Sequence, residues 1–244
     1  MAYGTLAKFE DKVDNCKKAI GSFNEALIVY RLKAPVQHAI IQNKLGYIYN
    51  SLAEEEDKAI NCKRAIECLL DALKVRTRES FPIQYGNSQF NLGNAYYMLA
   101  EVEDPALNYH NSIQAFYEAL KVWNIEQYPD EYALTCNNLG NAYLKQAQID
   151  SKAANYQKAI GAYEENLKVN TWQNAPFEFA KTQGNLGRVY SLLAEIDDKV
   201  GNCRKAIKAF REALKVYNPE KASADYAEIL NNLGSVYIKL AEEE

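Results

Sequence analysis

Two short phrases of apolar and small residues alternate along this chain, and both have helical spacing. The first phrase is a Leu-Gly pair with a tyrosine four residues after the leucine. Its leucines lie 47 residues apart, at Leu45, Leu92, Leu139, Leu186 and Leu233. At about 100° per residue, Leu139, Tyr143 and Ala147 fall within one arc of about 80°, which is the apolar stripe of a packed helix. The phrase therefore predicts one helix in each of five repeats.

The second phrase, Ala-Ile or Ser-Ile followed by a triplet such as Glu-Ala-Leu, predicts another helix in each repeat. It begins at Ala19, Ala65, Ser112, Ala159 and Ala206. Prolines suit the first helical position and mark the start of the first helix, at Pro35, Pro82, Pro129 and Pro176. Short polar residues are expected as N-caps of the second helix, at Asp11, Asp57, Asp104, Ser151 and Asp198. The period-two alternation that indicates strands is absent from the sequence.

Each repeat thus predicts a helical hairpin, with a first helix A and a second helix B. One hairpin cannot bury its own apolar stripe, so neighbouring hairpins must stack. We predict an all-α fold, an α-solenoid of stacked antiparallel helix pairs. The chain is expected to be a single array with units at about 3–34, 35–81, 82–128, 129–175 and 176–222 and a terminal helix at 223–244. The glycine after each leucine is expected to let another helix approach closely, which offsets its poor helix propensity.

The two ends of the chain have the same phase in the repeat. Leu6-Ala7 matches Leu52-Ala53, so we expect a shortened A helix that ends before Asp11. Five whole B helices and a sixth A helix at the far end make eleven helices in all. The glutamates 242–244 oppose a helix dipole, which suggests that the parent sequence continues into a further B helix. Such ends predict that copies could associate head to tail.

The motif LGNAY, followed by Ala-Ile and Glu-Ala-Leu, resembles the tetratricopeptide repeat. The resemblance covers essentially the whole chain, and five units show it in phase. The repeat is longer than usual, 47 residues instead of 34, and we expect longer helices because the extra residues look helical. Similar lengthened repeats resemble those of bacterial and archaeal multi-repeat proteins and of kinesin light chains. The resemblance implies a right-handed superhelix whose concave surface is lined by the A helices and receives partners.

Asparagine is concentrated on one side of the predicted A helices. The positions at −5, −2, −1, +2, +5 and +6 from each repeated leucine lie away from the apolar stripe. These 30 positions hold 11 of the 23 asparagines in the chain. Asparagine is a poor helix former, so the clustering needs a reason. An amide both donates and accepts, and a ladder of amides could hold an extended chain by its backbone.

The resemblance places this Asn-rich side on the concave surface, where we expect a protein or peptide partner. The predicted contact residues are asparagines with neighbouring cations and tyrosines: Asn43, Lys44, Tyr47, Asn50, Asn87, Asn91, Asn94, Tyr97, Asn137, Asn138, Asn141, Lys145, Lys181, Asn185, Arg188, Asn231 and Lys239. Five cations against Glu228 give this side a charge of +4 in a chain of −4, which favours an acidic segment or a C-terminal carboxylate. Some asparagines, especially Asn138 and Asn232, could instead bridge neighbouring A helices and bind nothing.

Other recurring polar positions predict structural roles. An asparagine one turn into each B helix is expected to form a structural hydrogen bond, at Asn15, Asn61, Asn108, Asn155 and Asn202. Asn166 replaces the small alanine of other repeats, so it is either hydrogen-bonded in the core or marks a looser B helix. Three of the five cysteines share a repeat position with tyrosines, and packing explains this better than a metal or disulfides do. These residues are Cys16, Cys62, Cys203, Tyr109 and Tyr156.

Composition and charge exclude several classes of function. The chain has 244 residues, 48% of them hydrophobic, and no compositional mark of disorder. A net charge of −4 lacks the basic excess of a nucleic-acid or membrane-surface binder. No apolar run is long enough to span a membrane, and the start lacks the apolar core of a secretory signal. We expect a cytoplasmic protein with no nucleic-acid or membrane partner.

Catalytic and cofactor motifs are not found in the sequence. Its two histidines, His38 and His110, lie in unrelated contexts, and no glycine-rich loop opens a helix. We therefore predict no enzyme activity, no metal and no cofactor. The main alternative to a peptide-binding scaffold is a structural module that associates through its ends, or the sensor arm of a larger signalling protein. RNA binding is disfavoured by the acidic balance and the few exposed aromatic residues.

Overall fold

The computed structural model describes residues 2–30, 34–220 and 222–242, and within these ranges the chain is all-α, with ten helices and no strand. The helices are α1 (Ala2–Tyr30), α2 (Pro35–Ala53), α3 (Lys58–Leu73), α4 (Pro82–Ala100), α5 (Pro105–Leu120), α6 (Pro129–Gln146), α7 (Lys152–Leu167), α8 (Pro176–Leu193), α9 (Lys199–Ala213) and α10 (Ser223–Ala241). Proline begins α2, α4, α6 and α8, as predicted, because its fixed φ and missing N–H suit the first turn of a helix. The α-solenoid of helix pairs is confirmed.

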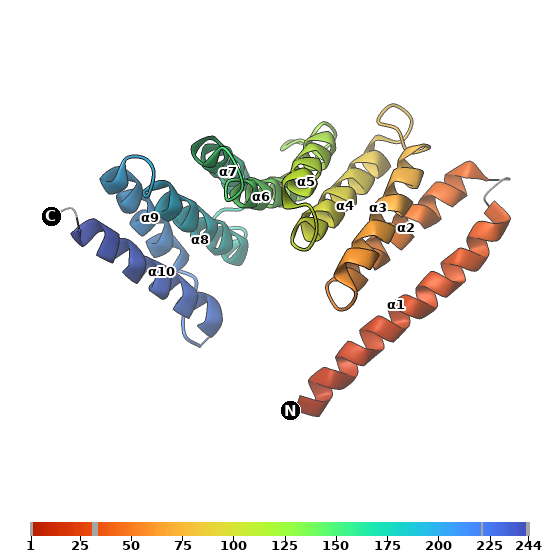
Figure 1. Cartoon of the computed structure of the whole chain (residues 1–244), viewed down its shortest axis with the longest axis horizontal. Helices are drawn as coiled ribbons and strands as arrows, with labels where there is room; N and C mark the ends of the chain where they lie inside the picture. The colour runs from red at the N-terminus through yellow and green to blue at the C-terminus, as the bar shows by residue number, and fades with distance from the viewer. Residues whose placement is uncertain (1, 31–33, 221, 243–244) are drawn as a thin grey trace. The chain divides into compact units, whose positions relative to one another are not determined.

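The helices form two compact units, Met1–Trp123 (unit 1) and Asn124–Glu244 (unit 2). In unit 1, α2 pairs with α3 and α4 with α5, while α1 packs on α2 and α3 packs on α4 (Figure 1). In unit 2, α6 pairs with α7 and α8 with α9, while α7 packs on α8 and α9 on α10. Neighbouring hairpins inside a unit thus share a core. The right-handed superhelix and the single array remain predictions.

The core of each unit is built from the recurring apolar positions. Leu45, Leu69 and Leu92 are buried in unit 1, and Phe210 and Val236 are buried in unit 2. The repeated cysteine position is also a packing position. Four of its five members, Cys62, Tyr109, Tyr156 and Cys203, are buried, and Cys16 in α1 is half-buried. Burial raises the pKa of the Cys62 thiol to about 11, so this side chain stays a neutral, unreactive thiol at pH 7.

Four of the five repeated glycines, all except Gly234, lie where another side chain leaves no room for a methyl group. A Cβ added to Gly46 would lie 2.5 Å from Leu69 in α3, and one added to Gly140 would lie 2.6 Å from the ring of Tyr163 in α7. The predicted reason for these glycines, close approach of a second helix, is therefore confirmed. The approaching helix is helix B of the same hairpin.

The residues expected to cap the B helices stand at the predicted positions, but their main role differs. Asp57, Asp104, Ser151 and Asp198 all adopt left-handed backbone angles, with φ between 36° and 46°. Of the four, Asp198 is the one whose side chain accepts a hydrogen bond from its helix, from the backbone N–H of Gly201 at 3.1 Å. Aspartate and serine are used here because short polar side chains are the non-glycine residues best suited to this conformation. Their position reverses the chain between helices A and B.

The predicted helix boundary at Asp11 is wrong. Helix α1 runs without a break from Ala2 to Tyr30, so the described residues contain ten helices where eleven were expected. Continuing into one helix keeps the i to i−4 backbone bonds that a turn would break. Asn15, inside this continuous helix, is exposed and has no preceding turn to bond.

The other structural asparagines behave as predicted. The side-chain amide of each donates to the backbone carbonyl five residues earlier, at 2.7–3.0 Å: Asn61 to Glu56, Asn108 to Glu103, Asn155 to Asp150 and Asn202 to Asp197. These bonds hold the turn between helices A and B. Asn166 is hydrogen-bonded in the core, which confirms the first of the two alternatives. Its amide donates to the carbonyl of Ala133 at 2.8 Å and accepts from the Thr182 hydroxyl at 2.9 Å.

Candidate functional site in the A-helix face

The A-helix face of unit 1 contains a cleft of about 470 Å³. It lies over α2 and α4, with α1 and the segment after α3 at its edges. Its lining residues are Phe23, Asn43, Lys44, Tyr47, Ile48, Arg76, Gln84, Asn87 and Asn91. Five of these belong to the predicted contact set, so the structure brings together Asn43, Lys44, Tyr47, Asn87 and Asn91. We call this the unit 1 cleft.

A chain of hydrogen bonds fixes one wall of the unit 1 cleft. The buried hydroxyl of Ser88 donates to Asn43 Oδ1 at 2.7 Å and accepts from Arg76 Nη1 at 3.2 Å. Asn43 therefore stands in α2 with its carbonyl oxygen already bonded to α4. Its Nδ2 donor remains available for a ligand in the cleft. The Ser88 hydroxyl thus sets the positions of Asn43 and Arg76. Because Ser88 is buried, a ligand in the cleft cannot displace it without entering the core.

The other side chains of the unit 1 cleft are more accessible. Tyr47 is 60% exposed, and Asn87 is also exposed. Lys44 lies with its ammonium 5.6 Å from the centre of the Phe23 ring, where the ring face attracts a cation. These residues place amide donors and acceptors, one phenol and one ammonium beside the apolar surfaces of Phe23 and Ile48. Such a mixture suits a peptide, which has polar backbone groups and apolar side chains.

Two predicted contact residues, one on α2 and one on α4, make their contacts within the protein. Asn50 is buried and donates from Nδ2 to the backbone carbonyl of Asn91 at 2.8 Å, which ties α2 to α4. Tyr97 is half-buried and meets Tyr109 edge to face, with ring centres 5.5 Å apart. Asn94 is half-buried and does not line the cleft. Asn50 thus bridges neighbouring A helices, the structural role that we considered for some asparagines of this face.

Most of the predicted contact residues of α6 also form hydrogen bonds within the protein. Asn137 is buried and donates to Asn138 Oδ1 at 3.3 Å. Asn141 Oδ1 accepts from the Tyr163 hydroxyl at 2.6 Å and from Asn185 Nδ2 at 3.5 Å. These contacts join α6 to α7 and α8. Lys145 is half-buried at the end of the same helix.

A smaller cleft of about 70 Å³ lies between α8 and α10 in unit 2. It gathers three more predicted residues, Lys181, Asn185 and Arg188. Asp225 and Glu228 line the same space, so its cations face carboxylates of the protein itself. Asn231 is exposed but does not line this cleft.

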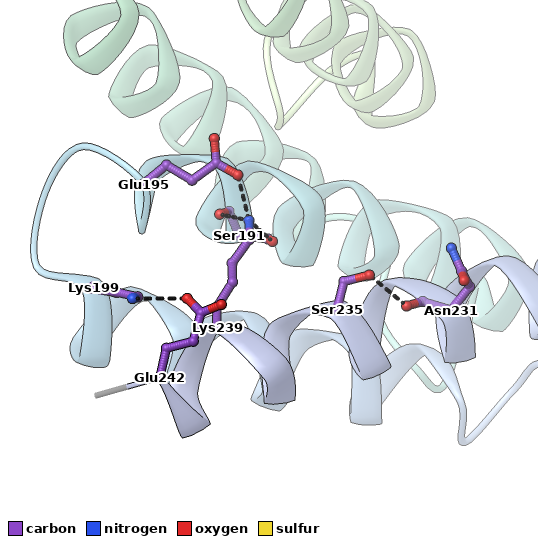
Figure 2. Close-up of polar contacts among 7 residues, drawn as sticks. All are labelled: Ser191, Glu195, Lys199, Asn231, Ser235, Lys239 and Glu242. Atoms are coloured by element: carbon purple, nitrogen blue, oxygen red, sulfur yellow. Dashed lines mark hydrogen bonds and ion pairs between the residues drawn. The ribbon is translucent and has the colours of Figure 1, made fainter. Parts of the chain in front are cut away.

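Lys239 is bonded within the protein, as Figure 2 shows. Its ammonium bonds the backbone carbonyl of Ser191 at 3.0 Å, the Ser191 hydroxyl at 3.2 Å and Glu195 Oε1 at 2.6 Å. Close by, Lys199 pairs with Glu242 at 3.3 Å. Lys239 therefore fixes α10 to α8, and we omit it, with Asn50 and Asn137, from the contacts proposed below.

Four lining residues of the cleft lie outside the predicted contact set, namely Phe23, Ile48, Gln84 and Arg76, and Arg76 is the charged one. It lies after α3, outside the A helices whose periodicity predicts the contact set. A signal was nevertheless present, because Arg76 occupies the repeat position of Trp123 and Tyr217. A charged residue that takes the place of large aromatic ones within a repeat deserves a functional explanation. Burial lowers the pKa of Arg76, yet an arginine remains charged at neutral pH.

Comparison with known proteins supports the fold alone. No family model matches this chain, and no curated protein matches it. Among solved structures it is similar to the crystal structure of BtubC (BKLC) from P. vanneervenii, with a TM-score of 0.61 and 17% sequence identity. The match covers 96% of this chain and 84% of that chain. Together with the helix pairs described above, this similarity makes the chain a helical repeat protein.

The described residues also bear on metal binding and on membrane insertion. No group of three or more histidine, cysteine, aspartate or glutamate side chains in the described part of the chain is arranged to hold a metal ion. Across the same residues, none of the helices combines the length and apolar character needed to cross a membrane.

Proposed function

We propose that this chain is a protein-interaction scaffold of the tetratricopeptide type that binds an extended peptide of a partner along its A-helix face. The observation that carries the proposal is the unit 1 cleft, which gathers amides from two successive A helices beside apolar surface. The side chains of successive A helices recur in a row along this face. The peptide groups of an extended backbone also recur in a row, so several amides can bond one peptide. Amides that donate and accept can bond such a backbone whatever its sequence.

The proposed contact residues are of two kinds: side chains held in place by hydrogen bonds within the protein, and exposed side chains that can change conformation. Asn43 is held by Ser88 and offers its Nδ2, whereas Asn87 and Tyr47 are exposed and can adjust to a ligand. An anchored group loses little entropy on binding, and this favours affinity. Asn91 completes the set in α4, and Lys44 adds a positive charge at the edge. Binding, and not catalysis, is the function that these side chains support.

Selection of peptides tests this proposal directly. A library of random peptides displayed on phage is selected against the purified chain, and a selected peptide is titrated into three proteins. The double substitution Tyr47→Ala and Asn87→Ala should weaken binding at least about tenfold, since hot-spot contacts to tyrosine and to paired amides are worth more than about 1.4 kcal/mol together. The melting temperature should stay near that of the wild type because both side chains are exposed.

Asn111→Ala is the matched control for that experiment. Asn111 lies in α5 of the same unit, outside the A-helix face, and has no side-chain hydrogen bond in the structure. The control should bind the selected peptide as the wild type does. If the double substitution and the control bind equally well, the unit 1 cleft is not the binding site and the proposal fails.

A second candidate function is end-to-end association of this chain, and helix α10 favours it. Gly234 has open space where a Cβ would point, whereas its repeat counterpart Gly187 is covered by Phe210. Ile238 in the same helix is 66% exposed. A second copy could cover this apolar surface with a helix. Sedimentation equilibrium should then show association that Ile238→Asp abolishes, and a monomer at every concentration would exclude this candidate.

A further inference from the structure

Arg76 is a buried cation without an anion. Only 8% of the residue is exposed, and its single hydrogen bond runs from Nη1 to the hydroxyl of Ser88. No carboxylate of the described residues pairs with it. A guanidinium has five N–H donors, so protein groups satisfy only a small part of its hydrogen-bonding capacity. None of its nitrogens is fully buried without a partner, so the remaining donors are accessible from the cleft. Polar groups that are buried and charged normally have partners, because removing them from water is costly.

The other repeats show what this position holds when only packing matters. Trp123 lies 47 residues after Arg76 and Tyr217 lies 94 residues after Trp123, and both are buried aromatic residues. Of the other two repeats, the first has Tyr30 here and the fourth has Asn170. A large apolar side chain would stabilise the fold better than an unpaired guanidinium does. The arginine therefore has a use other than the stability of unit 1.

The surroundings of Arg76 are positive and open to a ligand. Arg76 and Lys44 line the same cleft, and none of the side chains that line it is acidic. Lys44 has no acidic partner among the described residues either; its contact is the ring of Phe23. The smaller cleft of unit 2 differs, because Asp225 and Glu228 face its Lys181 and Arg188. The unit 1 cleft is thus the one that lacks a counter-charge of its own.

We propose that Arg76 is a carboxylate-binding residue of the unit 1 cleft and that it receives an acidic group of the bound peptide; this inference rests on the proposed function. A carboxylate can bond two N–H donors of one guanidinium side by side, an arrangement that lysine cannot form. Ser88 and Asn43 hold Arg76 in place before the ligand arrives. Asn87 and Asn91 can bond the adjoining backbone, and Phe23 and Ile48 offer an apolar wall to a neighbouring side chain.

The carboxylate can come from two sources, a peptide C-terminus or an aspartate or glutamate side chain. Three dipeptide probes distinguish them: acetyl-Ala-Phe with a free carboxylate, acetyl-Ala-Phe-amide, and acetyl-Ala-Glu-amide. Inorganic phosphate serves as a fourth probe. Each is titrated into the full chain while the Nε–H resonance of Arg76 is followed by ¹H–¹⁵N NMR. The resonance is assigned with Arg76→Lys, which removes it.

We expect the Arg76 resonance to shift and saturate with at least one of the two carboxylate probes, and the tighter probe identifies the source. The neutral amide should bind at least about tenfold more weakly, because charge-assisted bonds are roughly twice as strong as neutral ones. Arg76→Leu should abolish binding of the carboxylate probes, while its melting temperature stays at or above that of the wild type. Arg78→Leu, at an exposed arginine two residues away, should bind as the wild type does.

Three results would overturn the inference: equal binding of the neutral amide, unchanged binding by Arg76→Leu, or tighter binding of phosphate than of either carboxylate. Failure here can be told apart from failure of the proposed function. If selected peptides still need Tyr47 and Asn87 but no carboxylate probe moves the Arg76 resonance, only the inference is wrong. If carboxylate probes bind at Arg76 but selected peptides ignore Tyr47 and Asn87, the extended-peptide proposal is wrong.

Discussion

The side-chain amide of Asn50 donates to the backbone carbonyl of Asn91 at 2.8 Å and so joins two successive A helices. Both residues belong to the Asn-rich face, yet they serve different ends. Asn50 is buried and its amide N–H is used within the fold, whereas the side chain of Asn91 lines the cleft. Asparagine thus has two roles on this face. It stabilises the packing of successive A helices, and it places polar groups in the cleft, where a ligand could bind.

Asn50→Ala should destabilise the protein by about 1 kcal/mol. The substitution removes one side-chain hydrogen bond, and a typical net value for such a bond is about 1 kcal/mol. The free energy of unfolding in urea measures the loss. Asn87→Ala is the comparison, because Asn87 is exposed and its substitution should change the stability by less than about 0.5 kcal/mol. Equal stability of the two variants would show that the bond between α2 and α4 contributes nothing.

Gly140→Ala and Gly161→Ala should have opposite effects on stability. A Cβ at position 140 would lie 2.6 Å from the Tyr163 ring, and overpacking of this kind costs about 1–3 kcal/mol. Gly161 lies inside α7 with nothing within 4 Å of its Cβ position. There alanine should gain up to about 1 kcal/mol from its better helix propensity. Melting temperatures of the two variants test the contrast, and a stabilised Gly140→Ala would contradict the packing described here.

Asn166→Ala should cost about 1–2 kcal/mol, because it leaves the Thr182 hydroxyl without its present acceptor. The loss is limited, since Thr182 can turn to the carbonyl four residues before it. Thr135, at the same repeat position, already bonds the carbonyl of Glu131 in this way. In a double-mutant cycle, Thr182→Val should cost less in the Asn166→Ala background than in the wild type. Strict additivity would mean that the two side chains do not cooperate.

The stability of the protein should fall above pH 10. Burial, as the largest cause, raises the pKa of Tyr85, Tyr109 and Tyr217 to about 12, against about 10 for an unfolded tyrosine. Between these values the unfolded chain releases protons that the folded chain keeps, so rising pH favours unfolding. The contribution is fully present below pH 10 and is lost as the pH rises through 12. Ultraviolet absorbance of tyrosinate, followed together with circular dichroism, should show these groups ionising only as the helices unfold.

The sequence predicts the hairpins well because their determinants are local and repeated. Proline at the start of α4 and the contact of Gly140 with Tyr163 both follow from residue patterns that recur in four successive repeats. The boundary at Asp11 could not be predicted in the same way. The same local signal precedes α3, where Asp57 does adopt the left-handed turn. At Asp11 no turn forms, and helix α1 continues through this residue.

The candidate site is harder to predict than the fold. Helical periodicity assigns a side chain to one face of a helix. It does not reveal which side-chain amides form hydrogen bonds within the protein. Asn50 and Asn87 were assigned to the same side of the A helices, yet Asn50 is buried and bonds the neighbouring helix whereas Asn87 is exposed. That difference depends on packing between repeats. Arg76 was missed because it lies outside the A helices. A comparison of every repeat position, and not only of those on one helix, would have found it.

Photocrosslinking is the most direct test of where a peptide lies. A peptide selected against the full chain is synthesised with a benzophenone side chain at each position in turn, irradiated with the protein, and the crosslinked residues are identified by mass spectrometry. The account predicts crosslinks to Tyr47 in α2 and to Gln84 and Asn87 in α4, in the order of the peptide sequence. Crosslinks confined to the B helices α3 and α5 would contradict it.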